Sequence, residues 1–167
     1  MTLAIAKALL ECNGSYVKLS QKAIDNMRLL GALYPHAGYG GRFSSWLKAL
    51  ETKPYNSFGN GSAMRVSAVA YVADSIEEVK DLSYKVTALT HNHPEGIKGA
   101  EVAAVSVYMA LQGSSMQEIK DIVIKDYYPM DFTLDEIRDT YRFNETCQNT
   151  VPQALEAFFE STGFEDA

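Results

Sequence analysis

The chain has 167 residues, is 47% hydrophobic, and carries 15 Lys and Arg against 21 Asp and Glu, a formal net charge of -6. One domain over residues 1–167 is expected, and the scattered basic residues argue against a nucleic-acid partner. No apolar run reaches the length of about 18 residues that a membrane-spanning helix needs, and the isolated Cys12 and Cys147 are typical of a reducing, cytoplasmic protein.

Helical signals dominate the first half of the chain. An Ala- and Leu-rich segment at the start ends at Asn13-Gly14, a helix stop, and a second helix opens at Ser20 and stops at Pro35. A Gly-rich loop, 36–41, separates these from a short helix around Trp46. The helices expected here cover residues 2–11, 20–34, 44–50 and 62–72, the last of them mostly buried.

In the second half of the chain, capping patterns predict where the helices begin. A Ser or Thr followed three residues later by Glu is a capping-box pattern, and it recurs at Ser75, Ser115 and Thr133. Thr150 opens a further helix, which Gly163 ends, and an Ala- and Val-rich helix is expected over 98–112. No segment alternates with the period of a β-strand, so the predicted fold is all-α.

The loop 55–65 concentrates residues that can approach a ligand. Gly59 and Gly61 permit close backbone contact, and Asn60 supplies both donors and an acceptor. The loop leads into a predicted helix N-terminus, which suits a phosphate. The alternative is a plain turn in which Ser62 caps the helix.

The loop 90–100 contains two of the three histidines, His91 and His93. One hypothesis is zinc ligation, because His-x-His-Pro resembles the start of the motif of JAMM-type zinc isopeptidases. That motif continues with Ser and Asp seven and ten residues after the Pro, where this chain has Glu101 and Ala104, so the pattern fails. The alternative is a helix-helix loop whose imidazoles make capping hydrogen bonds.

Taken together, the two loops resemble the ADP-ribosylglycohydrolase family. Residues 60–65 are similar to its signature N-G-[AS]-A-M-R, and residues 90–96 to its T-H-N-H-P-E-G loop. The segments 38–46 and 145–155 resemble the parts of the family that precede the first loop and close the domain. The resemblance implies a compact orthogonal multi-helix bundle that hydrolyses an ADP-ribose linkage with two magnesium or manganese ions.

The resemblance also assigns a ligand site to the two loops. Residues 57–61 would hold the distal ribose and the phosphates, Phe58 would lie beside the ligand, and residues 96–99 would line the pyrophosphate. ADP-ribose or an ADP-ribosylated substrate is therefore the expected partner. The expected substrate-binding residues are Ser57, Phe58, Gly59, Asn60, Gly61, Met64, His91, Gly96 and Gly99.

The family's metal ligands have no counterpart in the sequence. They lie in a T-D-D-T motif, an upstream Glu and a G-G-D-x-D-T motif, and none of these occurs. The expectation is a chain truncated at both ends, with Met1 an internal methionine, no metal pair and no hydrolase activity. Self-association is also expected, through an apolar stripe of the first helix formed by Leu3, Ile5, Leu9 and Leu10. A non-catalytic ADP-ribose-binding module and a protein-interaction module remain alternatives.

Overall fold

The computed structural model describes all residues 1–167, which form eight α-helices, four 3₁₀ turns and no strand. Its one ladder-type contact is an isolated antiparallel bridge between Gly59 and Thr146. None of the helices combines the length and apolar character needed to cross a membrane. The α-helices are α1 Thr2–Cys12, α2 Leu19–Leu33, α3 Gly41–Lys48, α4 Ile76–Thr87, α5 Pro94–Leu111, α6 Met116–Asp126, α7 Leu134–Ile137 and α8 Val151–Glu160. The 3₁₀ turns are η1 Tyr16–Lys18, η2 Ala63–Arg65, η3 Ser67–Tyr71 and η4 Cys147–Asn149.

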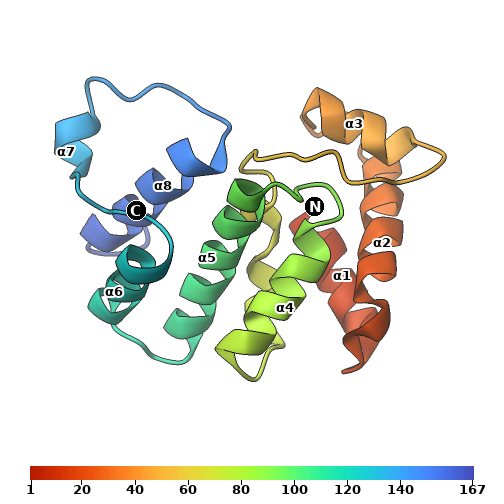
Figure 1. The fold of residues 1–167 in the computed structure, drawn as a ribbon, viewed down its shortest axis with the longest axis horizontal. Helices are drawn as coiled ribbons and strands as arrows, with labels where there is room; N and C mark the ends of the chain where they lie inside the picture. The colour runs from red at the N-terminus through yellow and green to blue at the C-terminus, as the bar shows by residue number, and fades with distance from the viewer.

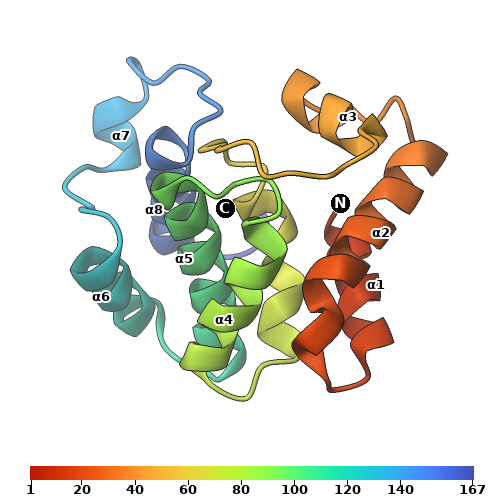
Figure 2. The ribbon, with the colours of Figure 1, turned by 45° about the vertical axis from the view of Figure 1, so that its right-hand side comes forward.

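The all-α prediction is confirmed, and the helices form three groups around one core. Helices α4 and α5 occupy the centre, with α1, α2 and α3 on one side and α6, α7 and α8 on the other (Figures 1 and 2). The turns η2 and η3 contact both α1 and α5 and so join the first group to the centre. Fully buried side chains from these elements, including Ile5, Val69, Leu82 and Val102, pack into a single cluster.

Side-chain caps explain where α4, α6 and α7 begin. Ser115 and Thr133 each accept a hydrogen bond from the backbone N–H three residues on, and the Glu at that position bonds back to the cap residue. Ser75 makes the first of these bonds, but the carboxylate of Glu78 accepts from the N–H of Asp74 instead. Each bond satisfies a donor that the first helical turn leaves free.

Three predicted helix boundaries are wrong. Helix α5 begins at Pro94 rather than at residue 98, because the ring Nδ1 of His93 accepts from the N–H of Glu95 and caps the helix. Helix α3 begins at Gly41, three residues earlier than predicted, with the preceding carbonyl of Gly40 accepting from Ser44. Helix α8 ends at Glu160 rather than at Gly163.

The predicted helix over 62–72 is also wrong, because this segment forms η2 and η3 instead. The hydroxyl of Ser62 caps nothing and donates to the carbonyl of Gly96, 3.0 Å away. The apolar residues Val66, Val69 and Val72 recur every third position, which places them on one face of a 3₁₀ helix. On that face Val66 and Val69 are fully buried and Val72 is partly buried, and the segment contacts α1 and α5.

The expected apolar stripe of α1 is only partly exposed. Ile5 and Leu9 are buried in the core, whereas Leu3 and Leu10 are 75% and 78% exposed. Ile5 and Leu9 are four residues apart and share the face that packs on α2 and η3. The prediction that all four leucine and isoleucine side chains form an exposed stripe is therefore wrong for two of them.

Candidate ligand-binding site

A cavity of about 650 Å³ lies against the long loop that follows α3. This loop passes the ends of α4 and α5 (Figure 1). Five stretches of chain line it: residues 1–2, residues 37–43, the loop 55–65, His91, and residues 143–145. Six of the nine expected substrate-binding residues are among its walls: Ser57, Gly59, Asn60, Gly61, Met64 and His91.

Backbone hydrogen bonds hold the two predicted loops together. The N–H groups of Tyr55 and Ser57 both donate to the carbonyl of Thr90, at 3.4 and 3.3 Å. The N–H of Asn56, whose φ of 52° is left-handed, donates to the side-chain oxygen of Asn92 at 2.7 Å. Asn tolerates this conformation, so the turn at Asn56 fixes the entry of the first loop against the second.

A third segment, just before η4, fastens the first loop from the other side. The N–H of Asn60 donates to the carbonyl of Glu145 at 2.7 Å, and the N–H of Cys147 donates to that of Phe58 at 2.8 Å. The thiol of Cys147 donates to the carbonyl of Gly59 at 3.1 Å. These bonds bring Glu145 and its neighbour Phe143 to the cavity.

A buried arginine forms part of the cavity wall. Arg65 is 2% exposed, and one of its Nη atoms donates to the carbonyl of Val86 at 3.2 Å and to the hydroxyl of Thr90 at 2.8 Å. Burial lowers the pKa of Arg65 to about 10, so the side chain is charged at neutral pH. Because both partners are uncharged, its positive potential is available to the neighbouring cavity.

His91 is buried against the same hydroxyl. Its Nδ1 is 2.7 Å from the Oγ1 of Thr90. Burial, followed by the charges of Arg65 and Arg42, lowers the pKa of His91 to about 3, so the imidazole is neutral at physiological pH. The other ring nitrogen, Nε2, lies near the loop: a methyl group added at Gly61 would be 3.5 Å from it.

Three of the expected substrate-binding residues do not line the cavity. Phe58 is partly exposed and packs on His93, with ring centroids 5.2 Å apart. Gly96 and Gly99 lie inside α5, where a Cβ would come within 2.5 Å of the carbonyl oxygen of Ser57 and 2.6 Å of the Sγ of Cys147. In the structure these glycines allow close helix packing instead of facing the cavity.

Four residues that line the cavity were not among the predicted site residues: Arg42, Tyr55, Arg65 and Glu145. Of these four, only Arg65 could have been noticed from the sequence. It is a charged residue at the end of the signature segment, directly before the apolar Val66. Arg42 and Tyr55 reach the cavity through contacts between segments, which no local pattern encodes.

The residues present do not supply a metal centre. No three His, Cys, Asp or Glu side chains gather into a group that could hold a metal ion. His93 caps α5 while His91 faces the cavity, and Glu145 is the one carboxylate among the lining residues. A pair of Mg²⁺ or Mn²⁺ ions requires several oxygen ligands from separate positions, so this donor set does not fit it.

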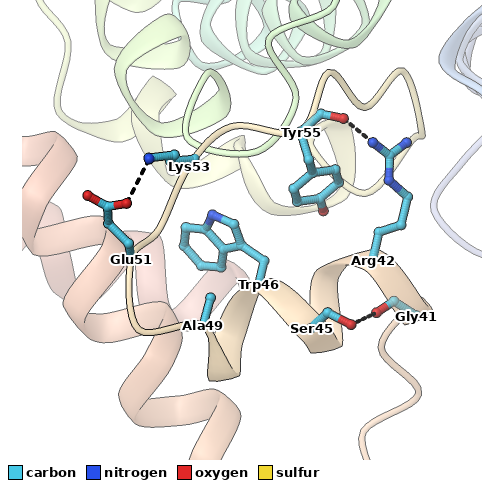
Figure 3. A pocket seen from close by; sticks show the side chains of 8 residues that line it. All are labelled: Gly41, Arg42, Ser45, Trp46, Ala49, Glu51, Lys53 and Tyr55. Atoms are coloured by element: carbon cyan, nitrogen blue, oxygen red, sulfur yellow. Dashed lines mark hydrogen bonds and ion pairs between the residues drawn. The ribbon is translucent and has the colours of Figure 1, made fainter.

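A second, shallower hollow of about 620 Å³ adjoins the cavity and shares Gly41, Arg42 and Tyr55 with it. Figure 3 shows Arg42 reaching from α3 to the backbone carbonyl of Tyr55, with the indole of Trp46 below. The guanidinium also lies 4.8 Å from the centroid of the Tyr55 ring. Arg42 and Tyr55 therefore form the partition between the two hollows.

Comparison with known proteins places these features in a family. The sequence model of the family described as ADP-ribosylglycohydrolase matches residues 1–166. The chain is 39% identical over 62 residues to the ADP-ribosylhydrolase ARH3 of Homo sapiens and to that of Mus musculus, and 37% identical to that of Gallus gallus. In each case the matched segment is 37% of this chain and spans only 17% of the curated relative.

Proposed function

The chain belongs to the ADP-ribosylglycohydrolase family, and we propose from this that its cavity binds the ADP-ribose unit of an ADP-ribosylated substrate. The observation that carries the proposal is the junction of the loops 55–65 and 90–92 at one cavity, held by three backbone N–H donors. The family's two signature loops would thus act on one ligand.

The chemistry of the walls suits this ligand. The cavity volume of about 650 Å³ falls within the range of small-molecule sites, about 300–1,000 Å³. Gly59 and Gly61 permit close approach of the backbone, and Arg42 and Arg65 supply the positive charge that a diphosphate requires. The exposed ring of Phe143 offers a surface on which a nucleotide base can stack.

We further propose that residues 1–167 bind ADP-ribose without hydrolysing it. In the chemistry that the family resemblance implies, two divalent ions polarise the ribose and orient a water. The side chains that face this cavity offer one carboxylate, Glu145, where such a pair needs several. The residues of this chain would therefore recognise, orient and partly enclose the ligand.

Titration calorimetry with ADP-ribose tests the binding proposal. Asn60→Ala and His91→Ala should each weaken binding by about 1–3 kcal/mol, which is about 5–150-fold in Kd. The matched controls are His36→Ala and Gln148→Ala, because both residues are exposed and neither lines the cavity. Failure of the wild type to bind would reject the proposal and favour a protein-interaction module. Equal affinity in all variants would place the site elsewhere.

A second assay tests the absence of turnover. The chain is incubated with an ADP-ribosylated peptide and Mg²⁺ or Mn²⁺, and released ADP-ribose is measured. No release above the metal-only blank is expected. Turnover that a chelator abolishes would show that the chain assembles a metal site which its carboxylate positions do not suggest.

A further inference from the structure

The hydroxyl of Thr90 joins two side chains that the proposed function uses separately. It accepts from an Nη of Arg65 at 2.8 Å and lies 2.7 Å from the Nδ1 of His91. Thr90 is fully buried, and the phenol of Tyr55 also lies within hydrogen-bonding reach of its hydroxyl. Water cannot therefore substitute for either bond.

The hydrogen bonds of the Thr90 hydroxyl favour one tautomer of His91. The guanidinium of Arg65 can only donate, so it occupies one lone pair of the Thr90 oxygen. If Nδ1 of His91 carried the ring proton, the oxygen would accept twice, and its own hydrogen would have only the phenol of Tyr55 as an acceptor. If the hydroxyl donates to Nδ1, its hydrogen has an acceptor 2.7 Å away, and its second lone pair is free to accept from that phenol. The second arrangement satisfies the hydroxyl and the phenol together, and an unsatisfied buried donor costs about 1–3 kcal/mol.

We propose that Arg65 and Thr90 are positioning residues that hold His91 as the neutral tautomer protonated at Nε2, so that His91 presents a hydrogen-bond donor to the ligand. The ligand part of this proposal rests on the proposed function, whereas the tautomer belongs to the free protein. It excludes His91 as a general base at Nε2 and as a cation that pairs with phosphate.

The position of Nε2 determines which ligand groups this tautomer can bind. This nitrogen faces the stretch between Gly59 and Gly61, which lines the cavity. An N–H at this point selects an acceptor, such as an oxygen of the diphosphate or of a ribose, and rejects a group that can only donate. The carbonyl of Thr90 binds the N–H groups of Tyr55 and Ser57, so the same residue also sets the distance between donor and loop.

The donor form persists across the physiological pH range. The charged groups that bear on His91 are Arg65 and Arg42, and both oppose a second proton on the ring. The phenol of Tyr55 also lies near, with ring centroids 6.2 Å apart, and burial raises its pKa, so it remains uncharged. Binding through His91 is thus expected to be independent of pH between about pH 5 and about pH 9.

Nitrogen NMR of the histidine side chains tests the tautomer without any ligand. In the wild type, Nδ1 of His91 should resonate as an unprotonated nitrogen and Nε2 as a protonated one, without change from about pH 5 to about pH 9. Thr90→Val removes the hydroxyl at nearly constant volume and should give a mixture of tautomers. Thr90→Ser retains the hydroxyl and should restore the wild-type pattern. A protonated Nδ1 in the wild type, with Thr90 donating to Tyr55 instead, would overturn the proposal.

Calorimetry separates this proposal from the proposed function. Thr90→Val should weaken ADP-ribose binding about tenfold, and Thr90→Ser should recover it. A wild type with the predicted nitrogen pattern but no affinity for ADP-ribose would reject the proposed function and leave the tautomer standing. Thr90→Val with the wild-type nitrogen pattern would reject the role of Thr90, whatever the ligand.

Discussion

Gly96→Ala distinguishes a packing role for this glycine from the ligand contact that the family resemblance implies. An alanine Cβ at this position would lie 2.5 Å from the carbonyl oxygen of Ser57, 3.1 Å from the Cβ of His91 and 3.4 Å from the Cα of Phe58. Two of these atoms belong to the backbone of the first loop, which cannot rotate aside as a long side chain can. The loop must therefore move away from α5.

The expected magnitude follows from two opposing terms. Overpacking of this kind costs about 1–3 kcal/mol, and Ala in place of Gly in a helix recovers up to about 1 kcal/mol. Gly96 lies in the first turn of α5, so the recovered part is small, and the net loss of unfolding free energy is about 1–2 kcal/mol. With a urea m value of about 2 kcal/mol/M, the unfolding midpoint should fall by roughly 0.5–1 M.

Urea unfolding followed by far-UV circular dichroism measures this loss. The matched control is Gly41→Ala at the first residue of α3, where a Cβ meets no atom within 4 Å, and its stability should be unchanged or slightly higher. If Gly96→Ala is as stable as the wild type and yet binds ADP-ribose more weakly, the packing argument is refuted. The glycine would then serve the ligand.

Three further perturbations have defined outcomes. Because the pKa of His91 is lowered to about 3 in the folded chain from 6.5, the unfolded chain protonates first, and stability is lost as pH falls from about 6.5 toward 3. By pH 5 this loss is roughly 2 kcal/mol, and urea melts of His91→Gln should lack it. Burial raises the pKa of the Cys147 thiol to about 11. A thiol reagent near pH 8 should therefore label Cys147 only as fast as the chain unfolds, and rapid labelling of the folded protein would contradict this. Lys120→Met should lower the free energy of unfolding by about 2–4 kcal/mol, because it removes the ammonium that pairs with the buried Glu156 carboxylate at 2.7 Å. In a double-mutant cycle, adding Glu156→Gln should recover part of this loss.

The elements that the sequence predicted well are those whose cause is local. The capping boxes at Ser115 and Thr133 fix their helices through bonds within four residues, and such bonds are visible in the sequence. The start of α5 was missed because His93, an uncommon cap, takes the role usually filled by Ser, Thr, Asp or Asn. The segment 62–72 was predicted as an α-helix, although Val66, Val69 and Val72 recur every third position, a spacing that fits a 3₁₀ helix.

In the candidate site, too, the residues in local motifs were predicted and those that depend on distant contacts were not. The two loops and His91 could be identified from the short motifs at residues 60–65 and 90–96, because each motif is contiguous in the sequence. The packing contact of Gly96 between helix α5 and the first loop could not be predicted from the sequence. A glycine suits a ligand contact and a close packing contact equally well. Arg65 could not be placed either, since its partners Val86 and Thr90 are 21 and 25 residues away in the chain.

The bond between Cys147 and Gly59 has a consequence for how the chain folds. It joins residues 88 apart in sequence, whereas α4 and α5 contact each other across a short loop. Closing so long a loop is entropically costly, and contacts of this range form late when local ones are available. The central helices should therefore gain protection from hydrogen exchange before the N–H groups of Asn60 and Cys147 do. During synthesis the cavity would remain unfinished until the segment around residue 147 has left the ribosome, so an emerging chain would have its central helices before it has a binding site.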